Sequence, residues 1–319
     1  MEKYHLGIDV GSTTVKVVLI DEKEEIAFER YRRNDGAPLA VLLEELSSME
    51  EAFHPSSISS TTVTGIGGKT LAPLLEAHLV NEVVAHATAT TFFHPSARSI
   101  IEIGGEDAKF ILLDRGPPGE PVISDFAMNT MCAAGTGIFL EQQAVRLGYT
   151  IEELGRVALK SKVPPRIAGR CTVFAKSDMV HLQQKAVPDY EIVAGLCLAL
   201  ARNLKSNILK GKRVPPPVVF QGGVAANPGV QKALKEVLGL KPGELIIPKH
   251  HATMGAIGAA LIGKRRLKPT GDKGKERLQR HLTLKPTFKS LPPLKRTTPP
   301  STLHYPKTIA GEELSLIHI

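Results

Sequence analysis

The sequence predicts an α/β fold with two lobes built from a repeated unit. Apolar runs alternate with segments of helical period from residue 4 to residue 263, which is the pattern of strands and crossover helices on a mainly parallel sheet. In addition, the letters IDVGS at residues 8–12 and IEIGG at residues 101–105 each place an acid and a glycine turn between apolar runs. Two such units would face each other across a cleft and hold a ligand from both sides.

The alternation of apolar runs and helical segments divides the chain as follows. Strands are expected at residues 4–9, 15–20, 26–32, 59–64, 99–103, 108–113, 218–221 and 244–247. Helices are expected at residues 39–52, 71–79, 137–147, 151–161, 190–209, 229–238 and 254–262. We expect residues 1–95 to form the first lobe, residues 96–250 the second, and residues 251–263 a helix that returns to the first lobe.

The net charge of +8 belongs to the C-terminal part of the 319-residue chain. Residues 264–319 hold 13 Lys and Arg against 4 Asp and Glu, whereas residues 1–263 hold 27 against 28. The stretch 264–319 also contains two Pro-Pro pairs and lacks apolar periodicity, so we expect a basic linker or tail rather than a nucleic-acid-binding face. Its last six residues, LSLIHI, match the translation of a sequencing adapter, which predicts that the natural gene continues past this point.

The sequence favours a cytoplasmic protein. No run approaches the roughly 18 to 20 uninterrupted apolar residues of a membrane helix, and the chain opens into a strand rather than a signal peptide. The three cysteines, Cys132, Cys171 and Cys197, have spacings unlike a small disulfide scaffold, which predicts reduced thiols. Reduced thiols are available to bind a metal.

The first glycine turn, GIDVGSTT at residues 7–14, is predicted to bind phosphate. Gly11 lacks the Cβ that would block the approach of phosphate oxygens to clustered backbone N–H groups, and Asp9 could hold Mg²⁺ through water. The nucleotide contacts expected here are Gly11, Ser12, Thr13, Thr14 and Lys16. An ordinary tight turn is the alternative, and the segment is neither a Walker loop nor a G-x-G-x-x-G motif.

The second glycine turn, IEIGGED at residues 101–107, repeats this arrangement with more acids. Gly104 and Gly105 are expected to contact phosphate, and Glu102 or Glu106 to orient the attacking water or act as base. Phosphoryl transfer requires mainly positioning and charge stabilisation, which acids on opposing turns around Mg²⁺ provide. A solvated acidic loop is the alternative for this segment taken alone.

A third segment, FQGGVAANP at residues 220–228, is expected to receive adenosine. It ends a strand and opens a helix with Asn227 as N-cap, and its small residues Gly222, Gly223 and Ala225 would let a flat ring lie against backbone. A fourth, ATMGAIGAA at residues 252–260, predicts a helix with a small-residue face for close packing at a hinge, or an ordinary core helix.

The four segments, taken in order, resemble the phosphate-1, phosphate-2, adenosine and connect-2 motifs of a known superfamily. It contains actin, Hsp70 chaperones and sugar kinases. The resemblance implies a two-lobed actin-like ATPase fold of duplicated ribonuclease H-like domains that binds ATP with Mg²⁺.

Two cysteines are predicted to lie beside helix starts. Cys132 precedes the helical stretch 138–147, and Cys171 follows a glycine and precedes helical sequence. Unsatisfied N–H groups there favour thiolate, the form that binds iron, but iron–sulfur clusters usually require four thiolates. A homodimer with one cluster on its two-fold axis would supply four, and two buried structural cysteines are the alternative. Cys197 lies in an apolar helical run and is interpreted as a small core residue.

The letters CAAGTG at residues 132–137 and GRCTVFAKSD at residues 169–178 are specific for a known family. They resemble the ATP-dependent activators of 2-hydroxyacyl-CoA dehydratases and the related benzoyl-CoA reductase ATPase subunits, over about residues 3–263. The resemblance implies a homodimer with a bridging [4Fe–4S] cluster held by Cys132 and Cys171. It also implies that ATP hydrolysis drives one electron, from a donor such as reduced ferredoxin or flavodoxin, into a dehydratase-like iron–sulfur partner.

Two positions depart from the family pattern, because Glu102 and Glu106 replace the usual Asp and Gln of the second phosphate motif. This resembles a long multidomain branch that fuses two activator-like domains to a dehydratase-like region. Two further interpretations remain open: a small-molecule kinase of the same fold, and a nucleotide-binding module without turnover. Neither would need Cys132 beside a helix start.

Overall fold

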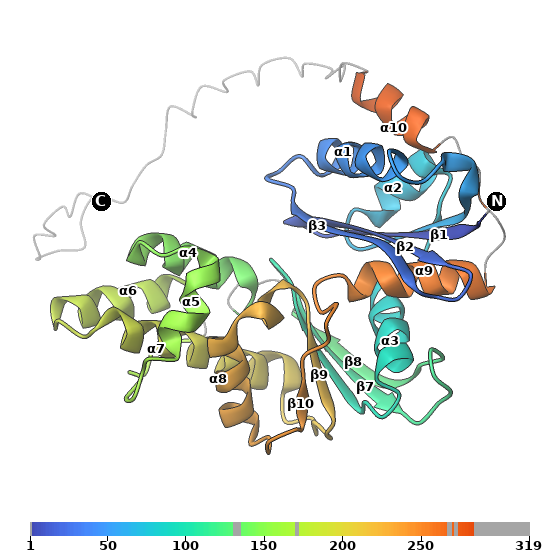
Figure 1. Ribbon diagram of the computed structural model, residues 1–319. Helices are drawn as coiled ribbons and strands as arrows, with labels where there is room; N and C mark the ends of the chain where they lie inside the picture. Colours follow the sequence, from blue (N-terminus) through green and yellow to red (C-terminus); the bar gives the residue numbers. More distant parts are fainter. Residues whose placement is uncertain (1, 130–134, 170–171, 267–269, 271–273, 284–319) are drawn as a thin grey trace, which may run out of the picture. The chain divides into compact units, whose positions relative to one another are not determined.

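Two five-stranded sheets form the framework of this computed structural model, which describes residues 2–129, 135–169, 172–266, 270 and 274–283 (Figure 1). The first sheet has the order β3-β2-β1-β4-β5 and the second β10-β9-β6-β7-β8. The first contains β1 (Tyr4–Val10), β2 (Thr14–Asp21), β3 (Ile26–Arg33), β4 (Ile58–Thr64) and β5 (His78–Leu79). The second contains β6 (Ser99–Ile103), β7 (Ala108–Asp114), β8 (Val122–Met128), β9 (Val218–Gln221) and β10 (Leu245–Ile246).

The repeat seen in the sequence is a repeat of topology. β1 pairs antiparallel with β2 and parallel with β4, and β6 pairs antiparallel with β7 and parallel with β9. The outer pairings β2–β3 and β7–β8 are also antiparallel, whereas β4–β5 and β9–β10 are parallel. The expectation of mainly parallel sheets was therefore wrong, because short hairpins join the first three strands of each unit.

Two helices, α3 (Glu82–Phe93) and α9 (Met254–Arg266), pack against each other and lie between the sheets in Figure 1. A Cβ on Gly258 of α9 would overlap the backbone of Ala85 in α3, and one on Gly7 of β1 would overlap the backbone of Ala256 in α9. The small-residue face predicted for this helix therefore permits close packing on both sides.

The remaining helices cover the sheets. The first sheet carries α1 (Pro38–Glu50), a 3-10 turn (Pro55–Ser57) and α2 (Gly68–Leu75). The second lobe contains α4 (Gly137–Leu147), α5 (Ile151–Ala158), α6 (Thr172–Gln184), α7 (Asp189–Asn203), a π-helical turn (Leu204–Leu209), a 3-10 turn (Gly223–Ala226) and α8 (Pro228–Leu238). One stretch, Asp189–Leu209, is long and apolar enough to cross a membrane by length and composition, but 72% of its apolar 18-residue window is buried within the protein. It is a core helix, and many of its apolar residues belong to the largest apolar cluster.

Several expectations about elements were wrong. The helix expected at 71–79 ends at Leu75, because Glu76 adopts a left-handed conformation and residues 78–79 pair as β5. The strand β8 and the helix α3 were not expected as elements, whereas α6 matches the helical sequence expected after Cys171. The predicted linker contains α10 (Gly274–Thr283), which packs against α1 and α2 and forms an ion pair from Arg277 to Glu76.

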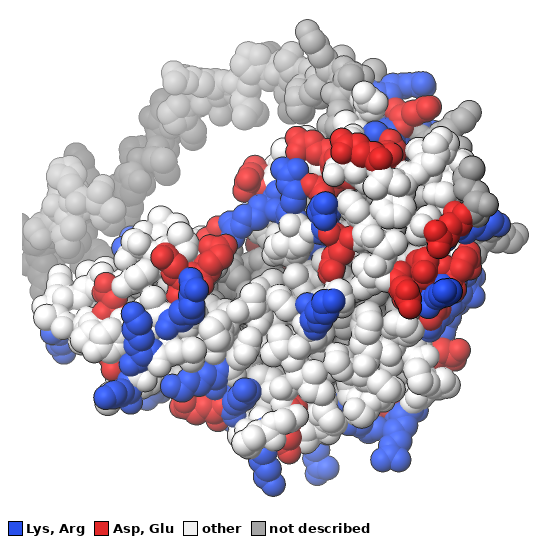
Figure 2. Space-filling view, in the orientation of Figure 1, with Lys and Arg blue, Asp and Glu red and all other residues white. Residues whose placement is uncertain are grey.

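The charges of the folded part are mixed. Figure 2 shows Lys and Arg side chains interspersed with Asp and Glu over much of the visible face. This agrees with the near balance of charges in residues 1–263.

Candidate functional site

The tips of the two predicted glycine turns meet. The β1–β2 turn is closed by a hydrogen bond from Gly11 N to Thr14 O of 2.9 Å, and the β6–β7 turn by one from Gly104 N to Asp107 O of 2.9 Å. A Cβ on Gly105 would overlap the side chain of Thr13, so glycine is required where the turns approach each other. The sequence repeat thus places two glycine turns against each other.

Two adjoining hollows open at these turns and share Thr13, Thr14, Gly104 and Gly105 in their walls. The larger, of about 500 Å³, has a mixed wall that includes the predicted nucleotide contacts Gly11, Ser12, Thr13, Thr14 and Lys16 but not Asp9. The smaller, of about 340 Å³, has a mostly apolar wall. A nucleotide crossing the shared wall would have its phosphates in the larger hollow and its base in the smaller. The larger hollow is therefore called the phosphate hollow below.

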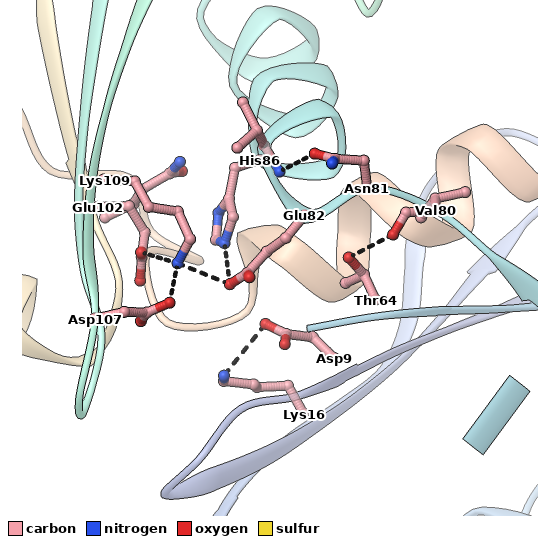
Figure 3. A network of polar contacts seen from close by, with 12 residues as sticks. Asp9, Lys16, Thr64, Val80, Asn81, Glu82, His86, Glu102, Asp107 and Lys109 are labelled. Atoms are coloured by element: carbon pink, nitrogen blue, oxygen red, sulfur yellow. Dashed lines mark hydrogen bonds and ion pairs between the residues drawn. The ribbon is translucent and has the colours of Figure 1, made fainter. Parts of the chain in front are cut away.

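Asp9 presents a buried carboxylate beside the phosphate hollow. One oxygen, Oδ2, lies 3.2 Å from Lys16 Nζ, whereas Oδ1 has no hydrogen-bond partner among the described residues (Figure 3). Glycine is required around it, because Cβ atoms on Gly65 and Gly255 would each lie 2.6 Å from an Asp9 oxygen. An unpaired buried carboxylate oxygen is costly unless a cation or water completes it, so Asp9 fits the predicted Mg²⁺ role.

Lys16 and Asn34 support the same turn. Burial lowers the pKa of Lys16, but the carboxylates of Asp9 and Glu102 more than offset it, so the pKa is raised and the ammonium stays charged. The buried Asn34 donates from Nδ2 to Gly11 O at 3.2 Å and to Ser12 O at 3.0 Å. Asn34 was not predicted as a site residue, since it lies 20 residues away along the chain.

The acids of the second turn surround a buried lysine that was not predicted as a site residue. Lys109 is fully buried, and its Nζ lies 2.9 Å from Glu82 Oε1, 2.9 Å from Glu102 Oε2 and 2.6 Å from Asp107 Oδ2 (Figure 3). Burial lowers the pKa of Lys109, but the three carboxylates raise it far more, so the ammonium remains charged. Burial raises the pKa of Glu102, and Lys109 opposes that shift.

Glu102 and Glu106 therefore differ in environment. Glu102 lines the phosphate hollow but is buried and paired with Lys109, whereas Glu106 lines the same hollow and is exposed. Which of them orients the attacking water stays a prediction.

Helix α3 contributes two further polar residues to this region, Glu82 and His86. Glu82 lines the phosphate hollow and lies 3.7 Å from His86 Nε2. Burial raises the pKa of Glu82, but His86 and Lys109 more than offset it, so Glu82 stays ionised. Ligand atoms of Glu82, His86 and Glu102 lie within 4.8 Å of one another, as in a metal site, but the Lys109 ammonium already contacts both carboxylates. Lys109 thus supplies the positive charge that a metal would bring.

The smaller hollow contains part of the predicted adenosine segment. Gly223 and Asn227 line it, whereas Gly222 and Ala225 do not. Gly222 has φ +90° and donates from its N to His251 O at 2.7 Å, and Ala225 is buried with its carbonyl accepting from Gln231 Nε2 at 2.8 Å. Gly222 and Ala225 therefore stabilise the conformation of the segment at residues 220–228 without lining the smaller hollow.

Asn227 caps α8 as predicted, accepting from Val230 N at 3.0 Å. Further wall residues come from elements distant in sequence, including Tyr31, and Arg33 with its ion-pair partner Glu141. No local sequence motif predicted these residues, because each lies on an ordinary strand or helix.

The two cysteines predicted to bind iron, Cys132 and Cys171, lie outside the described residues. The structure describes the helices that follow them, α4 from Gly137 and α6 from Thr172. Cys197 is buried in the core of the second lobe, and burial raises the pKa of its thiol to about 12. Its interpretation as a small core residue is confirmed.

The model of the BadF/BadG/BcrA/BcrD ATPase family matches residues 6–263, most of the chain. The chain belongs to this family. The resemblance seen in the glycine and cysteine motifs is thereby confirmed, and members of the family are ATPases.

Individual family members are similar to this chain over most of their own length. A 2-hydroxyisocaproyl-CoA dehydratase activator of Clostridioides difficile is 34% identical over 260 residues, which cover 81% of this chain and 94% of that protein.

Solved structures in the family agree with this. Component A of the (R)-2-hydroxyglutaryl-CoA dehydratase of Acidaminococcus fermentans has a TM-score of 0.76 at 31% identity, covering 83% of this chain and 98% of that one. The activator of the 2-hydroxyisocaproyl-CoA dehydratase from Clostridium difficile was solved with bound ADPNP. It has a TM-score of 0.73 at 31% identity, and the match covers 87% of this chain and 97% of that one. The predicted two-lobed actin-like ATPase fold is confirmed.

Proposed function

We propose that this protein is an ATP-hydrolysing activator that drives a low-potential electron into a 2-hydroxyacyl-CoA dehydratase-like iron–sulfur partner. The observation that carries the proposal is the pair of hollows that meet at the glycine turns, one lined by the glycine turns with Lys16 and acids and one mostly apolar. Family relatives named as dehydratase activators, one of them solved with an ATP analogue, support it.

The residues in and beside the phosphate hollow would each have a separate role in hydrolysis. Asp9 would hold Mg²⁺ through water, and the backbone of Gly11, Ser12, Gly104 and Gly105 would bind phosphate oxygens. An acid on the second turn, Glu102 or Glu106, would orient the attacking water. The fixed charges of Lys16 and Lys109 limit the repulsion among the carboxylates that converge here.

We assign a [4Fe–4S] cluster, shared by two protomers, to Cys132 and Cys171. It would supply one-electron transfer, and four thiolates require a homodimer. The described residues beside the two cysteine segments support the assignment, because Gly135 and Gly169 both lie against the side chain of Asn203. Both segments therefore approach one point of the protomer.

The partners follow from this chemistry. An electron donor such as reduced ferredoxin or flavodoxin would load the cluster, and the dehydratase-like enzyme would receive the electron. Both steps need a reducing compartment, so we place the protein in the cytoplasm. The alternative, a small-molecule kinase or a nucleotide-binding module of the same fold, would leave Cys132 and Cys171 without a role.

The test is purification without oxygen followed by iron and ATPase assays. We expect a brown protein with absorbance at about 400 nm, which Cys132→Ser and Cys171→Ser each abolish while ATP binding persists. Cys197→Ser is the matched control, because Cys197 is buried in the core and should leave the colour unchanged. A colourless protein after competent reconstitution would favour the kinase or the module.

A further inference from the structure

The side chain of Asn203, the last residue of α7, lies between the chain segments that lead to the two cysteines. It is buried, with 5% exposure, and its Nδ2 donates a hydrogen bond to the carbonyl of Gly169. On its other side, a Cβ built on Gly135 would lie 2.5 Å from Asn203 Oδ1. Gly135 is three residues after Cys132, and Gly169 is two residues before Cys171.

The segment before Cys171 is held by side chains at consecutive positions. Arg202 Nη2 donates to Ile167 O at 3.3 Å, and Asp178 Oδ2 accepts from Ala168 N at 2.8 Å. A Cβ on Gly169 would lie 2.5 Å from Ala199 O, so the segment rests directly on the backbone of α7. This segment is therefore anchored to α6 and α7.

The segment after Cys132 is held by a different part of the molecule. Gly137 N donates to Gly104 O and Ile138 N donates to Gly105 O, both at 2.8 Å. The first turn of α4 is thus bonded to the glycine turn that lines the phosphate hollow. The side chain of Asn203 lies between this nucleotide-side segment, which it contacts at Gly135, and the segment anchored on α6 and α7, to which it is hydrogen-bonded at Gly169.

The backbone around Asn203 is itself unusual. The next six residues, Leu204–Leu209, form a π-helical turn, a rare conformation that occurs frequently at functional sites. Gly135 has φ +107°, which favours glycine, and a side chain there would also collide with Asn203. Two uncommon backbone conformations therefore adjoin the same amide side chain.

We propose that Asn203 is a positioning residue that holds together the chain segments carrying Cys132 and Cys171. The inference rests on the proposed function for its consequence, which is that the spacing of the two thiolates within a protomer depends on this amide. Its donor holds Gly169, and its acceptor side limits the approach of Gly135. Loss of the amide would leave the carbonyl of Gly169 without this donor and free the Gly169 segment to move relative to Gly135.

The test uses two readouts, one of which needs no iron. In iron-free protein carrying Cys197→Ser, dibromobimane becomes fluorescent when it bridges two nearby thiols, so it reports the proximity of Cys132 and Cys171. In reconstituted protein, the rate of iron loss to a chelator reports how firmly the cluster is held. The variants are Asn203→Leu, which removes both polar groups, and Asn203→Asp, which retains the size and oxygen but removes the donor. Asn207→Leu is the matched control, since Asn207 is exposed on the same π-helical turn.

We expect both Asn203 variants to slow thiol bridging and to speed iron loss, on the order of tenfold, as for residues that support the surroundings of a metal. ATP binding and Asn207→Leu should remain at the wild-type level. If Asn203→Leu fails to fold, Asn203→Asp decides the question. Unchanged bridging and iron loss in a folded variant would overturn the inference while leaving the proposed function standing. Bridging that depends on Asn203 in a protein that never takes up iron would support the positioning role and overturn the cluster assignment.

Discussion

The ammonium group of Lys109 and the carboxylate of Glu82 form an ion pair of 2.9 Å that joins strand β7 to the first residue of α3. Because Glu102 and Asp107 contact the same ammonium, one buried cation organises three acids around the phosphate hollow. Glu82 at the start of α3 also interacts favourably with the helix dipole.

Replacing Lys109 with Met should destabilise the protein strongly. Removing the cation leaves buried carboxylates without compensation, which costs roughly 3 to 5 kcal/mol of unfolding free energy. Urea denaturation of the iron-free protein measures the loss, and Lys69→Met is the control because Lys69 is exposed. Adding Glu102→Gln to Lys109→Met should recover part of the loss by removing one unpaired charge. Equal stability of Lys109→Met and the control would contradict this description of the network.

Asp9→Asn should weaken Mg²⁺-dependent nucleotide binding more than metal-free binding. The amide removes the charge that would hold hydrated Mg²⁺, and outer-shell changes of this kind cost roughly 10 to 100-fold in metal affinity or activity. Titration of ADP with and without Mg²⁺ gives the two affinities, and steady-state ATPase assays give the turnover. Should the variant keep wild-type Mg²⁺ dependence, another group must hold the ion.

Gly105→Ala should reduce nucleotide affinity without unfolding the protein. The added methyl group would collide with the side chain of Thr13, so the two glycine turns must move apart. A double-mutant cycle with Thr13→Ala tests this cause, because the smaller residue relieves the collision. The methyl group should then cost less affinity in the Thr13→Ala background than in wild type. Additive effects in the cycle would show that the collision is not responsible.

Cys197 should lower stability at alkaline pH. Burial raises the pKa of its thiol from the ordinary value of 9.0 to about 12 in the folded protein, so the unfolded chain loses a proton that the folded chain keeps. Unfolding is therefore favoured as the pH rises from 9 towards 12, by up to about 1.4 kcal/mol per pH unit. The measurement is the difference in unfolding free energy between wild type and Cys197→Ala at pH 8 and pH 10. A difference that stays constant with pH would show that the thiol ionises in the folded state.

Much of the site was predictable because its motifs are local. A glycine turn between two apolar runs identified Gly11 and Gly104, and an Asn-Pro pair at a helix start identified Asn227. These features depend on backbone conformation over a few residues, so they can be predicted from the sequence alone.

Other parts were hidden for physical reasons. Helix α3 has little amphipathic pattern, because most of its residues from Val83 to Thr91 are buried, and its threonines favour strands over helices. The sequence offered two indications of this helix. Asn81 directly before Glu82 is a typical N-cap, and His86 follows Glu82 at the spacing of a helical side-chain pair. The burial of Lys109 has no local signal in the sequence, because its partners Glu82, Glu102 and Asp107 come together only in the fold.

By itself, the sequence determined the two repeated hairpins, the glycine turns and the family to which the chain belongs. The tertiary structure alone decided that Lys109 lies among three acids, that Asp9 Oδ1 beside Gly65 has no partner among the described residues, and that Asn203 touches both cysteine-bearing segments. The reason is that a turn depends on torsion angles over a few neighbouring residues, whereas buried charges and amides are defined by partners that only folding brings together.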